Sequence, residues 1–196
     1  MNSANKGFSL VELLIASSVG LIAIGIVGSV FLSGYQAANK RSLELLLQQD
    51  VNDAFRLIKE DVLRAGYVSG GSSSLKLSGA SNIVYVNHPY NNCLAYAYHS
   101  SDGLRYNEVM YNQNEKKLVY RVSSAVKTIA TVCNPKGAYS LIYDKQISVN
   151  QFDIENTPIS SASATSQLLT IKLAANIKSS AVSTTKSIQI KTRNWQ

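Results

Sequence analysis

The chain has 196 residues, a formal net charge of +7 and two cysteines. This length accommodates one membrane-anchored domain with a modest core rather than several domains. The charge is uneven, because residues 8–66 hold five basic and six acidic side chains, whereas residues 67–196 hold thirteen and six. The basic C-terminal part could attract nucleic acid or an acidic partner. A solvated surface that prevents association is the simpler interpretation, and we prefer it.

An uncharged run dominates the N-terminal part of the sequence. No charged residue occurs in the 27 positions from Leu13 to Asn39, and a helix of about 20 apolar residues can cross a bilayer. Glu12 stands at the start of this run, where a lone carboxylate is costly unless it finds a partner, so it indicates a functional site. A secretory signal has a shorter apolar core, of about 7–15 residues. An ordinary membrane anchor remains open, although it gives no reason for Glu12.

The residues around this carboxylate resemble those of a known family. The segment Lys6-Gly7-Phe8-Ser9-Leu10-Val11-Glu12 resembles the cleavage and assembly signature of type IV prepilins. The resemblance implies a leader peptide over residues 1–7, removed between Gly7 and Phe8 by a prepilin peptidase that also N-methylates Phe8. It further implies that the apolar segment is retained. Glu12 would then act in subunit assembly by meeting the new amine of a neighbouring subunit.

We expect a single helix from Phe8 to about Ala65. Residues 8–32 form its transmembrane or filament-core part, and residues 33–66 form an amphipathic continuation that Gly66 ends. Such a helix would be roughly 85–90 Å long at 1.5 Å per residue. A coiled coil is the alternative, but the apolar stripe is short and lacks the flanking charge pattern. The stripe follows steps of three and four: Leu43, Leu47, Val51, Ala54, Ile58, Val62 and Ala65.

Residues 67–196 predict a β-rich head. A Ser/Gly-rich linker at 69–74 comes first, and beyond it apolar residues recur with a period of two. The Ser/Ala/Thr-rich stretches 158–166 and 178–185 predict loops. One long helix followed by strands predicts an α+β, pilin-like fold in which the helix packs on an antiparallel sheet. Strands are expected at 83–86, 93–98, 105–111, 117–122, 139–143, 147–154, around 169–173 and around 188–192.

Further segments indicate which group of type IV pilins the chain resembles. The helix end, Gln48–Ile58 and Asp61–Tyr67, is similar to that of PilW-type minor pilins and of the related prepilin-peptidase-dependent protein B group. The run beginning at Cys93 and the terminal segment beginning at Ile190 also fit. The resemblance covers residues 6–67 closely and the rest of the chain in patches. Minor pseudopilins of type II secretion share the N-terminal motif and remain an alternative.

The two cysteines bear on the compartment of the head. Cys93 and Cys133 lie beyond a membrane segment, and an even count there fits one disulfide in an oxidising compartment. Two unpaired buried thiols are the alternative. Lys40 and Arg41 follow the apolar run and by themselves favour the opposite orientation. The cysteines and the prepilin motif together favour a head in the periplasm.

Motifs for catalysis or metal binding are missing from the sequence. His88 and His99 are the only histidines, and neither has metal-ligand spacing from the other or from a cysteine. There is no Gly-x-Ser-x-Gly nucleophile elbow and no phosphate-binding loop. We therefore expect no catalytic residue, no metal and no cofactor, and we predict that the protein is not an enzyme.

The predicted function is that of a minor pilin that helps initiate or caps a type IV pilus. Its expected partners are the prepilin peptidase, other minor and major pilins, and the inner-membrane assembly platform. We expect a single-pass inner-membrane protein that later enters the pilus. The alternatives are a minor pseudopilin, or a tip subunit whose basic head binds DNA or a surface. Lys116, Lys117 and Arg121 are the candidate nucleic-acid contacts.

Overall fold

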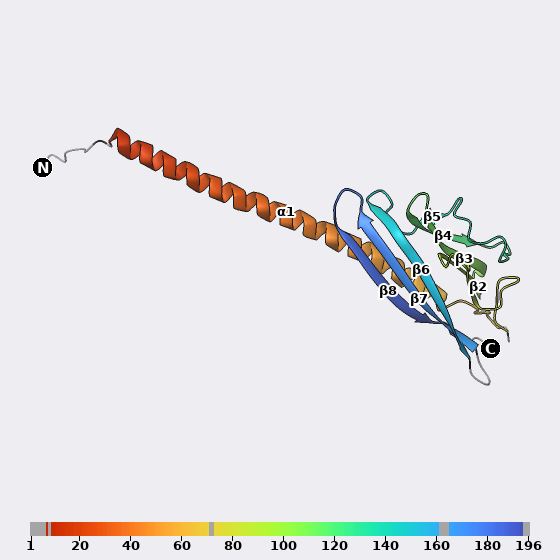
Figure 1. Cartoon of the computed structure of the whole chain (residues 1–196). Helices are drawn as coiled ribbons and strands as arrows, with labels where there is room; N and C mark the ends of the chain where they lie inside the picture. The colour runs from red at the N-terminus through yellow and green to blue at the C-terminus, as the bar shows by residue number, and fades with distance from the viewer. Residues whose placement is uncertain (1–6, 8, 71–72, 161–164, 194–196) are drawn as a thin grey trace. The chain divides into compact units, whose positions relative to one another are not determined.

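The structure, a computed structural model, describes residues 7, 9–70, 73–160 and 165–193. The chain divides into two compact units, residues 1–43 and residues 44–196. One helix, α1 (Leu10–Val62), contributes residues to both units, whereas every strand belongs to the second unit (Figure 1). The protein therefore has the α+β, pilin-like arrangement that the sequence predicts.

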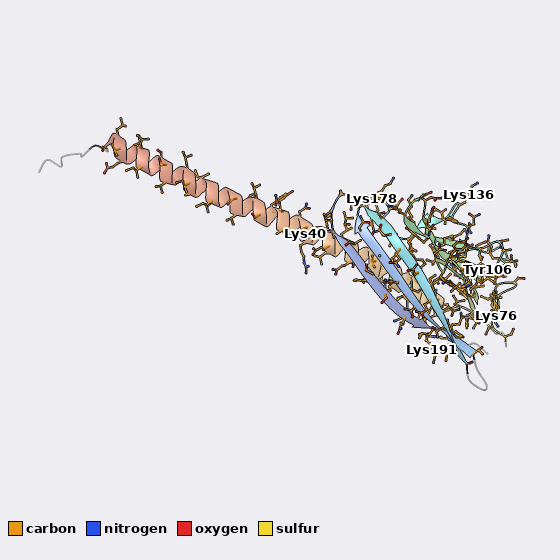
Figure 2. The ribbon with its side chains drawn as sticks, in the orientation of Figure 1. Lys40, Lys76, Tyr106, Lys136, Lys178 and Lys191 are labelled. Carbon is orange, nitrogen blue, oxygen red and sulfur yellow. A yellow bond between two sulfur atoms is a disulfide. The ribbon has the colours of Figure 1, made fainter. Side chains whose placement is uncertain are left out.

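In the first unit, α1 is an isolated apolar helix. The large apolar side chains from Leu10 to Leu32 are each 59–74% exposed, and Figure 2 draws them around the helix. Within the described residues, α1 is the one helix long and apolar enough to cross a membrane. A continuous apolar surface of this extent is not stable in water, so lipid or other protein must cover it.

In the second unit, one face of α1 is buried. The buried positions follow the predicted stripe from Leu47 to Val62, and Phe55, which lies outside that stripe, is buried with them. The helix ends at Val62, slightly before the predicted Ala65, and a turn leads to Gly66. Gly66 has a φ of 82°, a left-handed conformation that glycine adopts without strain. Its N–H donates to the Ala97 carbonyl at 2.8 Å, which directs the chain onto the first sheet.

The strands form two antiparallel sheets. The first sheet has the order β1-β2-β3-β4-β5, and the second has the order β6-β7-β8. The second sheet contains the longest strands, and a bulge between Val149 and Gln151 interrupts its first pairing. The bounds are β1 (Val84–Val86), β2 (Cys93–Ser100), β3 (Gly103–Asn112), β4 (Lys117–Ser123), β5 (Tyr139–Ser140), β6 (Ile147–Ser160), β7 (Thr165–Ile177) and β8 (Ser183–Lys191).

Two of the predicted loops are wrong in part. The stretch 158–166 is strand at both ends, because β6 continues to Ser160 and β7 begins at Thr165; residues 161–164 lie outside the described part. The stretch 178–185 is also shorter than predicted, because β8 already begins at Ser183. Segments rich in serine and threonine are typical of loops, but threonine is also favoured on the exposed face of a paired strand. The predicted strand 139–143 is reduced to the two residues of β5.

Both faces of the first sheet are covered. On β2, alternate side chains point to opposite faces, and all six residues from Cys93 to Tyr98 are buried. Tyr96 and Tyr98 face α1, where their hydroxyls donate to Asp61. Ala95 and Ala97 face the other way and pack beneath a layer of loops that contains Leu77 and Val132. The first sheet is thus a middle layer between the helix and the loops.

Asp61 connects the last turn of α1 to the first sheet. Its carboxylate accepts hydrogen bonds from the hydroxyls of Tyr96 (2.7 Å), Tyr98 (3.1 Å) and Tyr120 (3.2 Å). Arg64 lies 4.0 Å from the same carboxylate. Burial raises the pKa of Tyr96 well above its usual value, and the neighbouring carboxylate adds to the effect. Tyr96 therefore remains a hydrogen-bond donor throughout the physiological pH range.

Gln167 connects the two sheets. The Val84 N–H on β1 donates to Gln167 Oε1 at 3.0 Å, and Gln167 Nε2 donates to the Val84 carbonyl at 2.9 Å. The side-chain amide thereby pairs with the edge of β1 as a neighbouring strand would. Gln167 is 3% exposed, so these bonds satisfy groups that would otherwise be buried without partners.

We expect Asp61→Ala to lower the free energy of unfolding by about 2–4 kcal/mol, because it leaves the buried hydroxyls of Tyr96 and Tyr98 without their acceptor. Urea unfolding of the full chain in detergent, followed by near-UV circular dichroism, measures this. Asp53→Ala is the matched control on the same helix. It breaks an exposed pair with Arg56, which is worth less than about 1 kcal/mol. Equal losses in the two variants would contradict a special role for Asp61.

Candidate functional site: the N-terminal segment and the cystine face

The predicted cleavage site lies at the boundary of the described residues. Gly7 is described and exposed, whereas Phe8 lies outside the described part. Among the described residues, a Cβ atom added to Gly7 would meet no atom within 4 Å apart from its chain neighbours. Packing against the described residues therefore does not require glycine at this position. A requirement for glycine must come from outside the chain, as it would from a peptidase that approaches the backbone closely.

Glu12 is engaged by the backbone of its own helix. The Ser9 N–H donates to Glu12 Oε2 at 3.0 Å, and the Leu13 N–H donates to the Ser9 carbonyl at 3.1 Å. Ser9 is thus the N-cap residue, and Glu12 is the third helical residue, as in a capping box. This bond satisfies an N–H that has no acceptor within the helix. The negative charge is also favourable near the helix N-terminus.

The capping interaction adds a local reason for the carboxylate. Sequence reasoning attributed Glu12 to assembly alone, although Ser9-Leu10-Val11-Glu12 matches the Ser-x-x-Glu signature of a helix start. One carboxylate oxygen is used by the cap. Because an ionised carboxylate has about four acceptor sites, Glu12 can keep this bond and still accept another from a neighbouring subunit.

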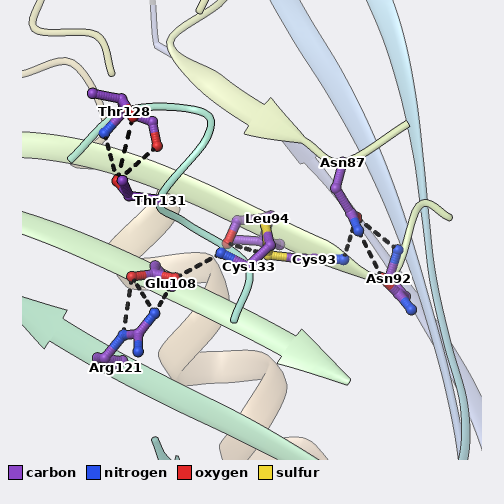
Figure 3. The surroundings of a disulfide bond; sticks show 9 residues. All are labelled: Asn87, Asn92, Cys93, Leu94, Glu108, Arg121, Thr128, Thr131 and Cys133. Atoms are coloured by element: carbon purple, nitrogen blue, oxygen red, sulfur yellow. Dashed lines mark hydrogen bonds and ion pairs between the residues drawn. A yellow bond between two sulfur atoms is a disulfide. The ribbon is translucent and has the colours of Figure 1, made fainter. Parts of the chain in front are cut away.

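Cys93 and Cys133 form the predicted disulfide (Figure 3), with their Cα atoms 5.7 Å apart. The bond lies on the face of the first sheet that points away from α1. We name this region, with Cys93, Cys133, Glu108 and Arg121, the cystine face. The disulfide joins β2 to the loop between β4 and β5. The two cysteines are 40 residues apart in sequence. In the chain-entropy model, closing a loop of this length contributes roughly 3–4 kcal/mol.

Side chains fix the backbone at both ends of this disulfide. The Cys93 N–H donates to Asn87 Oδ1 at 2.7 Å, and the Cys133 N–H donates to Glu108 Oε2 at 2.8 Å. Asn87 also accepts from the Asn92 N–H at 3.1 Å, which closes the turn between β1 and β2. The two chain segments are therefore held by hydrogen bonds as well as by the covalent link (Figure 3).

Arg121 neutralises the buried carboxylate of this face. Glu108 is 1% exposed, and Arg121 Nη2 lies 2.9 and 2.8 Å from its two carboxylate oxygens. The two residues are direct partners across β3 and β4. Arg121 also donates to the Lys136 carbonyl at 3.2 Å. Arg121, predicted as a nucleic-acid contact, thus holds the Cys133 loop against the sheet.

The other two predicted DNA contacts differ from each other. Lys117 lies 2.8 Å from both Glu115 and Asp144, and these hydrogen-bonded carboxylates raise the Lys117 pKa, while Lys117 lowers that of Asp144. Lys116 is exposed in the turn before β4, with a φ of 53°. The three cations therefore do not form a free basic surface, and DNA contact stays a prediction that this geometry does not favour.

Comparison with known families agrees with the N-terminal geometry. The model of the family described as prepilin peptidase-dependent protein B matches residues 40–193, and the prokaryotic N-terminal methylation motif matches residues 2–28. The chain belongs to the prepilin peptidase-dependent protein B family. No curated protein and no solved structure matches it.

Membership of this family defines the general class of the protein. It is a pilin-like protein processed by prepilin peptidase, and it interacts with that peptidase and with other pilins. The family is one of structural, pilin-type proteins. Among the described residues, no group of three or more His, Cys, Asp or Glu side chains could hold a metal ion.

Sequence reasoning missed several residues that organise the two parts of the site. Ser9 had a detectable signal, because its spacing to Glu12 is that of a capping box. Glu108 and Asn87 had no such signal. Glu108 lies 25 residues from Cys133, and Asn87 meets the backbone of Cys93 only because the turn between β1 and β2 folds back. The turn between β1 and β2 brings Asn87 to Cys93, and the pairing of β3 with β4 brings Glu108 to Arg121.

We expect Arg121→Lys to lower the free energy of unfolding by about 1–3 kcal/mol, because lysine cannot reproduce the two-pronged contact with buried Glu108. Urea unfolding of the oxidised full chain in detergent gives the value. Limited proteolysis between β4 and β5 should become faster. Lys116→Ala is the control in the same region and should change neither measurement. An Arg121→Lys protein as stable as the parent would show that the contact is not needed to hold the loop.

Proposed function

We propose that this family member is a minor pilin that helps initiate assembly of a type IV pilus or caps it. The observation that carries the proposal is the exposed apolar part of α1 with a single carboxylate at its start. Within the described residues, the large apolar side chains from Leu10 to Leu32 are each 59–74% exposed. A helix of this kind suits lipid before assembly and the packed helices of a filament core afterwards.

In the proposal, Glu12 forms the contact that selects the assembled state. Cleavage after Gly7 would create an amine on Phe8, the residue next to the N-cap. Methylation would leave this amine positively charged. A neighbouring subunit, shifted along the filament, would bring its amine to Glu12, while the Ser9 N–H keeps its bond to the other side of the carboxylate. In the low-dielectric core, losing one partner of such a pair costs about 3–5 kcal/mol.

The oxidised head supports a periplasmic location. Both cysteines of the chain lie in the second unit and are joined, and disulfides persist in the periplasm but rarely in the cytosol. We infer a single inner-membrane pass with the head in the periplasm, followed by entry into the pilus. The inner-membrane assembly platform would be a further partner. A minor pseudopilin of type II secretion would share all these features and is the alternative system.

Processing can be tested at the cleavage site. The mature protein should begin at N-methylated Phe8, as measured by mass spectrometry of its N-terminal peptide. Gly7→Val should block cleavage, because a side chain beside the scissile bond prevents close approach to the peptidase. Gly20→Val is the control, since it adds the same side chain within the apolar run and should leave cleavage intact. A mature protein that begins at residue 1 would contradict the proposal.

Glu12 can be tested with two variants that separate its two roles. Glutamine can replace glutamate in a capping box but carries no charge, whereas alanine loses both functions. If the ion pair drives assembly, Glu12→Gln and Glu12→Ala should both lower the ratio of sheared-filament protein to membrane protein, on the order of tenfold or more for a lost buried charge pair. Both should still be inserted and cleaved. Normal assembly of Glu12→Gln would contradict the proposed ion pair and would leave helix capping as the role of Glu12.

A further inference from the structure

We propose that the free edge of β8, together with the neighbouring surface of α1, binds an extended acidic segment of another polypeptide by adding it as a strand to the second sheet. Among the described residues, β8 pairs with β7 alone. Its other edge therefore presents backbone N–H and C=O groups that have no strand partner. Such an edge is a template for pairing with another chain.

The register identifies which backbone groups face outward. The Thr192 N–H donates to the Gln167 carbonyl at 2.9 Å, and the Ile177 N–H donates to the Val182 carbonyl at 2.9 Å. Both contacts use even-numbered residues on the β8 side, and the ladder between them has no register shift. Because hydrogen-bonding direction alternates along a strand, the odd-numbered residues direct their N–H and C=O groups to the free edge. These are Ser183, Thr185, Ser187, Gln189 and Lys191.

The packing beneath this edge is incomplete. Ile171 on β7 is fully buried, but its cross-strand partner Ile188 on β8 is only half-buried. Beside Ile188 lies a groove of about 480 Å³ whose floor includes Phe55 of α1. Figure 1 shows β8 as the outer strand of its sheet, next to the C-terminal part of α1. An added strand would cover Ile188 and extend the sheet over the helix.

The charges around the groove favour an acidic partner. Arg56 and Lys59 line it from α1, and Lys186 lines it from β8. Lys186 donates to Asn52 Oδ1 at 2.8 Å, and Arg56 forms an exposed ion pair with Asp53. No acidic residue occurs in β8, and Lys191 adds a further cation at its end (Figure 2).

The same charges disfavour a second copy of this chain as the occupant. Pairing β8 with another β8 would bring four lysines together with no acid to offset them, and like charges on neighbouring strands are destabilising. Lysine on an edge strand is also a common protection against self-association. A strand with carboxylates at alternate positions satisfies both constraints, because its backbone pairs with the edge and its acids face the groove cations.

The test uses the oxidised full chain in detergent and a fluorescent eleven-residue peptide in which Glu alternates with Val or Thr. Fluorescence anisotropy should detect saturable binding. The same peptide with Lys in place of Glu should not bind, and neither should a Glu peptide N-methylated at alternate residues, because it cannot form the strand ladder. Absence of binding by the Glu peptide, or equal binding by the N-methylated peptide, would overturn the proposal.

Variants of the protein test the two halves of the proposed surface. Ser187→Pro removes one outward N–H without removing a bond to β7, and it should weaken binding on the order of tenfold, the effect of one lost hydrogen bond. Ser187→Ala should bind like the parent. Arg56→Gln with Lys59→Gln should weaken binding and reduce its salt dependence. Because the N-methylated peptide tests the unmodified protein, misfolding of the proline variant would not hide the outcome. Unchanged affinity in a folded Ser187→Pro protein would overturn the proposal.

Discussion

The head depends on a buried carboxylate at the end of a helix. Asp61 gathers the hydroxyls of Tyr96, Tyr98 and Tyr120, and so fixes the last turn of α1 against two strands of the first sheet. A hydrophobic stripe by itself would allow the helix to slide or rotate, since apolar contacts have no direction. Hydrogen bonds to one carboxylate select a single register. The cost of burying the charge is offset because its oxygens receive several donors.

The cystine face, on the other side of the first sheet, also contains a buried carboxylate whose oxygens are hydrogen-bonded. Glu108 is buried, yet Arg121 and the Cys133 N–H satisfy its oxygens. Between the sheets, the buried amide of Gln167 is likewise hydrogen-bonded, because it pairs with the N–H and C=O of Val84 at the edge of β1. The head thus combines a hydrophobic core with a few fully bonded polar groups. Asp61 fixes the helix end, Gln167 fixes the edge of β1, and Glu108 with Arg121 fixes the Cys133 loop.

The apolar residues of the two units differ in how they are covered. The first part of α1 has no core of its own, so its stability in isolation comes from backbone hydrogen bonds and from the Ser9–Glu12 cap. In lipid this is sufficient, because every backbone group in a helix interior is paired. The head folds around its own core, and its remaining exposed features, among them the free edge of β8 and the cations beside it, are available to other chains.

The sequence by itself determined the class of the protein. The uncharged run from Leu13 to Asn39, the carboxylate of Glu12 before it, and the change of period from helix to strand are all local patterns, so they can be seen without a fold. They gave the long helix, the β-rich head and the family. The tertiary structure decided what depends on residues distant in sequence. Arg121 appeared to be a free cation until strand pairing placed it on Glu108, and the Ser/Thr-rich segments appeared to be loops until β6, β7 and β8 paired. Side-chain composition describes one residue at a time, whereas the energy of strand pairing depends on two residues that are distant in sequence. Local patterns therefore do not show which of these contacts form.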